Sequence, residues 1–252
     1  EAELKSAIKW EAEQHVPIPL EKVNLDYQVV KRPPKGASEE KMEVFLVAAP
    51  KNIVEKYLKI FKMADLQPLA LETELISICR ALVRKSEELN HCLVINIGSL
   101  SSDVAVTRGD QIIYTRSIST GGNALARAVA RDLNLEVAQA EEYKKSYGLD
   151  EKVLEGKVKG AIEPIFDVVV GEIKKTIKFC EEKEGVKLKS LFLCGGTAKL
   201  PGLVSYLANA LTLEVQVADP FAHIVLEEEQ KVKLGDDASL YTTAVGLAMK
   251  RI

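Results

Sequence analysis

Three strand-like segments in close succession constrain the fold of this chain more than any other feature. Residues 92–98, 102–108 and 111–118 are rich in apolar and β-branched residues, with only a few residues between them. Connections this short predict an antiparallel meander. Apolar residues then take up helical spacing from Gly121 onward, and an apolar run at 188–196 predicts a returning strand. This order of strands and helices predicts an α/β fold with a mixed sheet.

A smaller module is predicted in front of these strands. Residues 1–15 have helical spacing but no capping residue before them, so we expect that an amino-terminal piece is missing. The run at 23–30 alternates like a half-buried strand, 42–50 is predicted to be a second strand, and residues 51–64 carry one apolar helical face. The segment 66–72 is predicted to be a third strand. The sequence therefore predicts a small β-β-α-β unit.

Composition and charge exclude several classes of function. The 252 residues include 34 basic and 37 acidic side chains, and a net charge of -3 argues against a general nucleic-acid binder. The four cysteines form no C-x-x-C pair and the three histidines are far apart, which excludes the common zinc and redox frameworks. Since no apolar run approaches about 18 residues, we expect membrane contact only through a partner. The acidic run at 227–231 predicts a solvated loop.

A turn rich in serine follows the first strand of the meander and is the first candidate site. Backbone amides in such a turn can converge on a phosphate, small side chains permit the approach, and hydroxyl groups add donors. The plainer interpretation is an ordinary hairpin. The candidate phosphate-binding residues are Asn96, Gly98, Ser99, Leu100, Ser101 and Ser102.

The strand that returns at 188–196 ends in the second candidate site, within FLCGGTAKLPGL (192–203). Gly195 and Gly196 would let the backbone approach a flat base or ribose, where a Cβ atom would collide, and Thr197 follows them. Junctions between a strand and a helix at the carboxyl edge of a sheet are frequent ligand sites. A simple turn is the alternative.

The third candidate lies in AEEYKKSYG (140–148), which is predicted to be helical. Glu141 and Lys144 are three residues apart and share a helix face, with Lys145 beside them. The carboxylate could accept hydrogen bonds from ribose hydroxyls while the lysine stem lies along an adenine ring. An exposed ion pair of little energetic consequence is the alternative.

The three motifs in this order resemble those of the actin-like ATPase superfamily, which has a ribonuclease H-like fold. Residues 95–103 resemble its second phosphate motif, and 192–203 resemble its adenosine motif. Residues 120–150 resemble the corresponding stretch of the division protein FtsA, and 242–250 resemble the connecting helix at the carboxyl terminus. The resemblance implies ATP with Mg in a cleft between domains.

A narrower resemblance, carried by residues 15–30, 43–74 and 217–224, is to the PilM family of type IV pilus assembly. It implies a remnant of domain 1A at 1–19, an inserted domain 1C at 20–72, and an actin-like domain 2 at 73–252. Two departures from the superfamily pattern predict nucleotide binding with slow hydrolysis or none. The first phosphate hairpin is absent from this sequence, which makes ATP with Mg doubtful for this chain. Asn96 also replaces the usual aspartate, and an amide lacks the charge that holds hydrated magnesium.

The PilM resemblance also implies partners. Such proteins hold the cytoplasmic amino-terminal segment of the inner-membrane protein PilN in a groove between domains 1A and 1C. The residues expected at that groove, each of which could instead be core, are Val16, Ile18, Leu20, Val23, Leu25 and Tyr27. We expect a cytoplasmic scaffold at the inner membrane, held there by PilN without inserting into the membrane itself. It would form homo-oligomers and contact other platform proteins and assembly ATPases.

Two other functions remain open on the sequence alone. An FtsA-like protein that forms filaments shares the nucleotide motifs. A sugar or acid kinase of the same superfamily shares them too, but it needs a carboxylate base and a polar substrate pocket. Residues 20–72 show no cluster of that kind.

Overall fold

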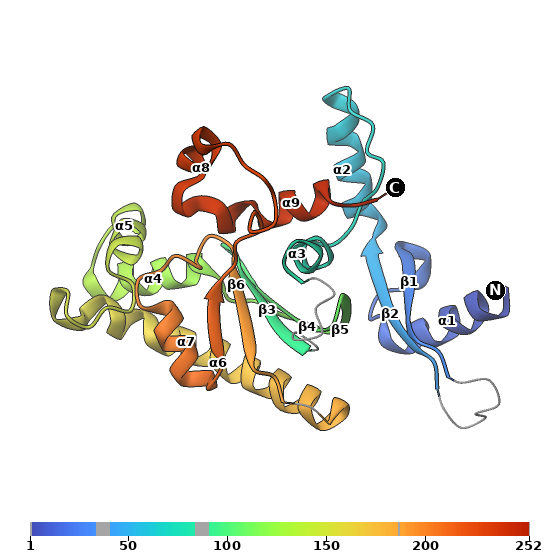
Figure 1. Cartoon of the computed structure of the whole chain (residues 1–252), viewed down its shortest axis with the longest axis horizontal. Coiled ribbons are helices and arrows are strands. Elements are labelled where there is room, and N and C mark those ends of the chain that lie inside the picture. The colour runs from blue at the N-terminus through green and yellow to red at the C-terminus, as the bar shows by residue number, and fades with distance from the viewer. Residues whose placement is uncertain (1, 34–40, 84–90, 186, 252) are drawn as a thin grey trace. The chain divides into compact units, whose positions relative to one another are not determined.

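The computed structural model describes residues 2–33, 41–83, 91–185 and 187–251. The chain divides into two compact units, one of residues 1–71 with residue 252, the other of residues 72–251. Figure 1 shows the helices and strands of both units. The expected division into three domains, at 1–19, 20–72 and 73–252, stays a prediction.

The first unit contains a two-stranded antiparallel sheet with a helix before it and a helix after it. Its elements are α1 (Ala2–His15), a 3-10 turn (Leu20–Lys22), β1 (Val23–Lys31), β2 (Glu43–Pro50) and α2 (Lys51–Met63). β1 pairs with β2 so that Tyr27 lies opposite Leu46. Proline lacks an N–H group, so Pro50 is suited to the end of the ladder, where it precedes α2. Both helices and both of these strands were predicted.

The prediction of a third strand at 66–72 is wrong. These residues have no regular secondary structure, and the side chains of Leu66, Leu69 and Leu71 are 59%, 76% and 46% exposed. An apolar alternation forms a strand only where a neighbouring strand pairs its N–H and C=O groups. In the described part of the chain, β1 and β2 pair only with each other. The small unit is therefore β-β-α rather than β-β-α-β.

The second unit contains a five-stranded mixed sheet in the order β5-β4-β3-β6-β7. Its strands are β3 (His91–Ile97), β4 (Ser102–Arg108), β5 (Gln111–Ile118), β6 (Ser190–Cys194) and β7 (Glu214–Val217). β3, β4 and β5 form the predicted antiparallel meander, whereas β6 and β7 run parallel to β3. Gly109, with a φ of +58°, lies in the tight turn between β4 and β5. The predicted α/β fold with a mixed sheet is confirmed.

Helices flank this sheet, with α6 along one side and α3 and α9 along the other (Figure 1). The helices of this unit are α3 (Glu74–Leu82), α4 (Gly122–Leu133), α5 (Val137–Tyr147), α6 (Lys157–Glu184), α7 (Leu203–Leu211), α8 (Glu228–Leu234) and α9 (Thr242–Ala248), with 3-10 turns η2 (Leu154–Gly156) and η3 (Gly235–Tyr241). The loop expected at 227–231 instead begins α8. Glu227 and Gln230 form a reciprocal capping box there, and this satisfies the first backbone N–H groups of the helix.

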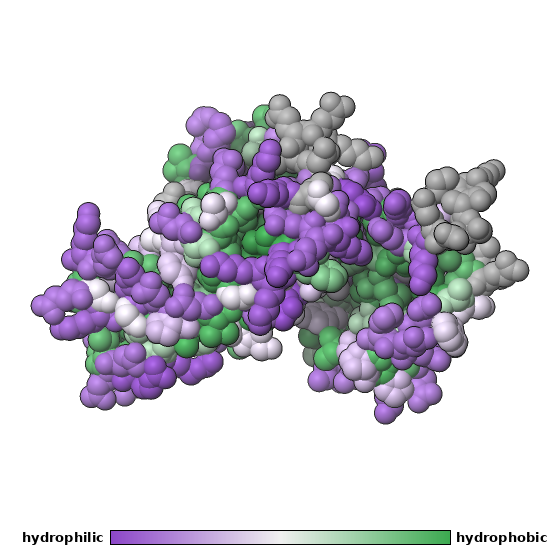
Figure 2. Space-filling view, turned by 90° about the horizontal axis from the view of Figure 1, so that it is seen from below, coloured by the Kyte–Doolittle hydropathy of each residue, from purple (hydrophilic) through white to green (hydrophobic). Residues whose placement is uncertain are grey.

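The core of the second unit lies between the sheet and α6. Leu93, Ile95 and Ile97 of β3 belong to it, and its largest fully buried side chain is Phe166 of α6. Every described residue of β3 after His91 is buried, as expected of a central strand covered on both faces. The surface seen from below is mostly hydrophilic (Figure 2). Side chains of β3 and β6 pack in this core, and the packing holds the ends of these two strands in place. The candidate site lies at those ends.

Helices α3 and α9 cross so closely that no side chain fits between them at Gly246. A Cβ atom there would lie 1.8 Å from the Ser77 carbonyl oxygen. Arg80 donates to the Gly246 carbonyl at 2.8 Å and to both carboxylate oxygens of Glu72, which is 5% exposed. Lys250 adds a bond of 2.8 Å to Glu72. The hydrogen bonds from Arg80 hold the pKa of Glu72 below its usual value despite burial.

Candidate nucleotide site

The parallel pairing of β3 and β6 brings two of the predicted motifs together. Asn96 lies beside Cys194 in the register, so the two strands end at the same edge of the sheet. The Thr197 N–H group donates to the Ile97 carbonyl at 3.3 Å. A Cβ atom on Gly195 would lie 2.5 Å from Asn96 Oδ1, which leaves glycine as the residue that fits. The serine turn and the glycine turn are therefore neighbours.

The serine turn is fixed by hydrogen bonds to its own backbone and to the start of α4. Gly98 N donates to Ser101 O at 2.9 Å, and Gly122 N donates to Gly98 O at 2.9 Å. Ser102 is 1% exposed and donates to the Thr120 carbonyl at 2.7 Å. Its hydroxyl therefore fixes the turn in this structure. Leu100 lies at the tip of the turn and is 73% exposed.

Lys144 is a buried cation next to both turns. Its side chain is 7% exposed, and Nζ donates to Glu141 Oε2 at 2.6 Å and to Gly122 O at 3.2 Å. A Cβ atom on Gly122 would lie 2.9 Å from Thr197 Oγ1 and 3.3 Å from Lys144 Nζ. Lys145 is 60% exposed and its Nζ lies 3.6 Å from Glu141 Oε1. The predicted face of α5 thus points at the glycine turn.

These side chains open onto a pocket of about 770 Å³. Its lining residues are Glu141, Lys144, Lys145, Gly196, Thr197, Lys199, Leu200, Val217, Asp237 and Leu240. Five of the six residues predicted to bind adenosine are in this set. The sixth, Gly195, faces Asn96 and Ile97 instead. The serine turn lies next to the pocket through Gly122, but its residues are not part of the lining that the structure describes.

Sequence reasoning missed half of this lining. Lys199 and Leu200 lie inside the recognised glycine motif, and Val217 ends β7, next to β6 in the sheet. Asp237 and Leu240 come from η3, and Asp237 forms an ion pair with Lys199 across the pocket. The parallel order of strands could have identified Val217, because ends of parallel strands meet at one edge. No comparable signal marks η3.

Asn96 is nearly buried and its amide group already has partners. It is 8% exposed, and Nδ2 donates to Glu74 Oε2 at 3.5 Å. The Cys194 thiol lies 3.8 Å from Asn96 Oδ1. Burial raises the pKa of that thiol to about 12, so it is neutral at physiological pH. Among the described residues, no group of three or more His, Cys, Asp or Glu side chains is placed to hold a metal ion.

The residues expected at a peptide groove lie in the first unit. Val23, Leu25 and Tyr27 alternate with exposed residues along β1, so they share one face of the strand, and Val23 is 4% exposed. Ile18 is 37% exposed, and Val16 and Leu20 are half-buried. The structure thus places three of the six on one surface. The groove itself stays a prediction.

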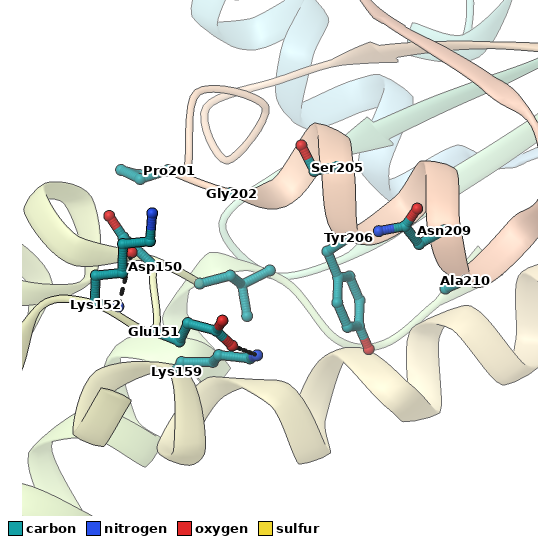
Figure 3. A pocket seen from close by; sticks show the side chains of 11 residues that line it. Asp150, Glu151, Lys152, Lys159, Pro201, Gly202, Ser205, Tyr206, Asn209 and Ala210 are labelled. Carbon is teal, nitrogen blue, oxygen red and sulfur yellow. Dashed lines mark hydrogen bonds and ion pairs between the residues drawn. The ribbon is translucent and has the colours of Figure 1, made fainter. Parts of the chain in front are cut away.

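A separate pocket of about 660 Å³ lies among residues 149–152, the start of α6 and α7 (Figure 3). Several of its polar groups bond to neighbours: Lys159 contacts Glu151 at 2.9 Å, and the Tyr206 hydroxyl donates to Asp167 at 2.6 Å. None of the eighteen candidate site residues lines it. We therefore assign the candidate nucleotide site to the pocket beside α5.

The family described as type IV pilus assembly protein PilM matches residues 1–252. The cell division protein FtsA of Neisseria meningitidis serogroup B is 24% identical over 223 residues, which are 78% of this chain and 53% of that protein. The ethanolamine utilization protein EutJ of Escherichia coli K12 is 22% identical over 46% of this chain and 37% of its own length. The chain therefore spans about half the length of the FtsA protein and a smaller share of the EutJ protein.

Solved structures confirm the actin-like fold. The chain superposes on a structure described as a PilM-PilN type IV pilus biogenesis complex with a TM-score of 0.85 and 27% identity, covering 98% of this chain and 72% of that one. MreB 5 of Spiroplasma citri bound to AMPPNP superposes with a TM-score of 0.54 at 16% identity, over 86% of this chain and 65% of that one. The second likeness concerns the fold alone.

Proposed function

This chain belongs to the family of type IV pilus assembly protein PilM, and from that premise we propose that it is a nucleotide-binding scaffold of the inner-membrane pilus platform. The observation that carries the proposal is the pocket beside α5, where the glycine turn and the Glu141–Lys144 face line one cavity and the serine turn lies next to it through Gly122. Domain closure that depends on the bound nucleotide would then change the surface offered to partners.

The residues of the pocket fit an adenosine nucleotide. A volume of about 770 Å³ lies within the usual range for small-molecule sites. Gly196 leaves room for the base, and Glu141 can accept hydrogen bonds from ribose hydroxyls. Lys144, held near Gly122 and Thr197, brings a positive charge next to Gly122, which bonds to the serine turn where the phosphates would lie. ATP is the ligand we propose.

Hydrolysis is not part of this proposal. Magnesium, when bound with ATP, neutralises phosphate charge, and it would need oxygen ligands from the protein or water. The described residues provide no cluster of carboxylates for it, and Asn96 contributes an uncharged amide that already bonds to Glu74. These residues fit a nucleotide better than they fit a resident metal ion. We propose a site that binds ATP and does not turn it over efficiently.

The proposed partner is the cytoplasmic amino-terminal segment of PilN. The likeness to the chain in the PilM-PilN complex supports it, as does the apolar face of β1 that carries Val23, Leu25 and Tyr27. An extended peptide could lie along such a face, with its side chains in alternate positions giving specificity. PilN would hold the protein at the cytoplasmic side of the inner membrane. Homo-oligomers and contacts with other platform proteins and assembly ATPases belong to the same proposal.

Calorimetric titration of the chain with ATP tests the nucleotide site. We expect binding by the wild type and an affinity about thirtyfold lower in Lys144→Met, because charged hydrogen bonds contribute roughly 2 kcal/mol. Lys178→Met is the matched control: its side chain is 78% exposed on α6 and is not part of the pocket lining, so we expect no more than about a threefold change. Thermal unfolding of both variants shows whether the fold is kept.

The outcome of this titration separates the pocket from the scaffold role. Equal ATP affinities for the two lysine variants would remove the pocket from the proposal. If ATP does not bind but a PilN amino-terminal peptide does, as measured by fluorescence anisotropy, the scaffold role survives without the nucleotide. If the chain binds neither ATP nor the PilN peptide, the proposed function is overturned.

A further inference from the structure

Helix α2 carries an apolar face that the described residues of its own unit leave exposed. Its members are spaced three or four residues apart, which puts them on one side of the helix. They are Ile53, Tyr57, Ile60 and Met63, with exposures of 44%, 56%, 60% and 80%. Val54 and Phe61, at other angles around the helix, are half-buried. We call the four exposed residues the α2 outer face.

The same helix is strongly basic within a chain that is acidic overall. α2 contains four lysines and one glutamate, whereas the net charge of the whole chain is -3. Lys51 donates to the Glu21 carbonyl at 2.7 Å. Lys56, Lys59 and Lys62 are exposed and make no ion pair with any side chain that the structure describes. Their charges are therefore available to an anionic partner.

An exposed leucine follows the end of the helix. The Leu66 N–H group donates to the Phe61 carbonyl at 2.9 Å, which holds Leu66 against the last turn. The Leu66 side chain is 59% exposed. An exposed apolar stripe with lysines beside it and a tyrosine within it is the pattern of helices that lie in a membrane interface.

We propose that the α2 outer face docks on the surface of an anionic lipid bilayer. The apolar side chains would enter the boundary between headgroups and acyl chains, and the lysines would meet the phosphates. A second copy of the chain fits this face less well, since a two-fold contact would place the lysines of both copies opposite one another. The charge of the face thus favours a lipid surface over self-association.

The expected contact is peripheral and weak. Among the described residues, no helix is long and apolar enough to cross a bilayer. One short amphipathic helix gives marginal, reversible binding, and stable attachment takes a second signal. In the proposed scaffold, PilN would be that second signal, but docking of α2 does not rest on nucleotide binding.

Vesicle flotation of the whole chain tests the proposal without any other protein. We expect the chain to float with vesicles that contain about one third phosphatidylglycerol, to float poorly with pure phosphatidylcholine, and to dissociate as salt is raised. The double variant Lys56→Glu/Lys59→Glu should lower the partition coefficient at least about 25-fold, since each lysine contributes about fivefold. Ile60→Asp should lower it about tenfold or more.

Val232→Asp is the matched control, because Val232 is 80% exposed and lies on α8 of the other unit. It should float like the wild type. Ile60 is itself exposed, so all variants should keep the wild-type circular dichroism. Equal flotation with neutral and anionic vesicles, or wild-type flotation of Ile60→Asp, would overturn the proposal. A dimer in sedimentation equilibrium that Ile60→Asp dissociates would assign this face to a second copy instead.

Discussion

Gly246→Ala is expected to lower the free energy of unfolding by about 3 kcal/mol or more, because the new methyl group would meet backbone. Its Cβ atom would lie 1.8 Å from the Ser77 carbonyl oxygen and 2.4 Å from the carbonyl carbon. Backbone cannot rotate away as a side chain can, so α3 and α9 must separate. Separation also weakens the bond from Arg80 to the Gly246 carbonyl and the contact of Lys250 with Glu72.

Thermal unfolding measures this effect, and a melting temperature about 10 °C below the wild type is expected. Gly171→Ala is the control, because a Cβ atom at Gly171, within α6, would meet nothing within 4 Å. Alanine favours helix over glycine, so this variant should be as stable as the wild type or up to about 1 kcal/mol more stable. Equal melting temperatures for both variants would contradict the close crossing of α3 and α9.

Gly195→Ala is expected to cost about 3 kcal/mol of stability and to reduce ATP affinity more than tenfold. Gly195 has a φ of +89°, which costs an L-amino acid about 1–2 kcal/mol. The added Cβ would also lie 2.5 Å from Asn96 Oδ1 and 2.6 Å from the Ile97 carbonyl oxygen. Relief of this clash moves the glycine turn away from β3, and with it one wall of the pocket.

Gly185→Ala separates backbone strain from the clash. Gly185 has a φ of +69° at the end of α6, and nothing lies within 4 Å of its Cβ position. This control should lose about 1 kcal/mol and keep the wild-type ATP affinity. Chemical unfolding and calorimetry on the two variants supply both quantities. If Gly195→Ala and Gly185→Ala lose the same stability and the same ATP affinity, the close contact between the two turns does not explain the glycine at position 195.

The sequence predicted the main elements of the second unit because their signals are local. β4 and β5 have the predicted limits, and a single glycine, Gly109, explains the turn between them. The prediction of a strand at 66–72 was wrong because apolar alternation is a local signal, whereas a strand also needs a neighbouring strand for its backbone hydrogen bonds. The sequence does not identify that neighbouring strand. The prediction of a loop at 227–231 was wrong because Glu227 and Gln230 form a capping box, which is a local signal for the start of a helix.

The candidate site was partly predictable for the same reason. Gly195, Gly196 and Thr197 follow a buried strand, and Glu141 with Lys144 shares a helix face, so each motif is visible in a short window. The meeting of these motifs follows from the parallel pairing of β3 with β6, which joins residues about one hundred positions apart. Asp237 and Leu240 belong to a 3-10 turn without a sequence signature, and only the folded chain brings them to the pocket.

Hydrogen exchange of the chain with and without AMPPNP tests most directly whether the serine turn and the glycine turn hold one nucleotide. We expect slower amide exchange in both segments, 98–102 and 195–200, when the nucleotide is bound. Residues 149–152, which line the other pocket, should exchange at an unchanged rate. Protection of 149–152 without protection of the two turns would contradict the assignment, and so would protection confined to one turn.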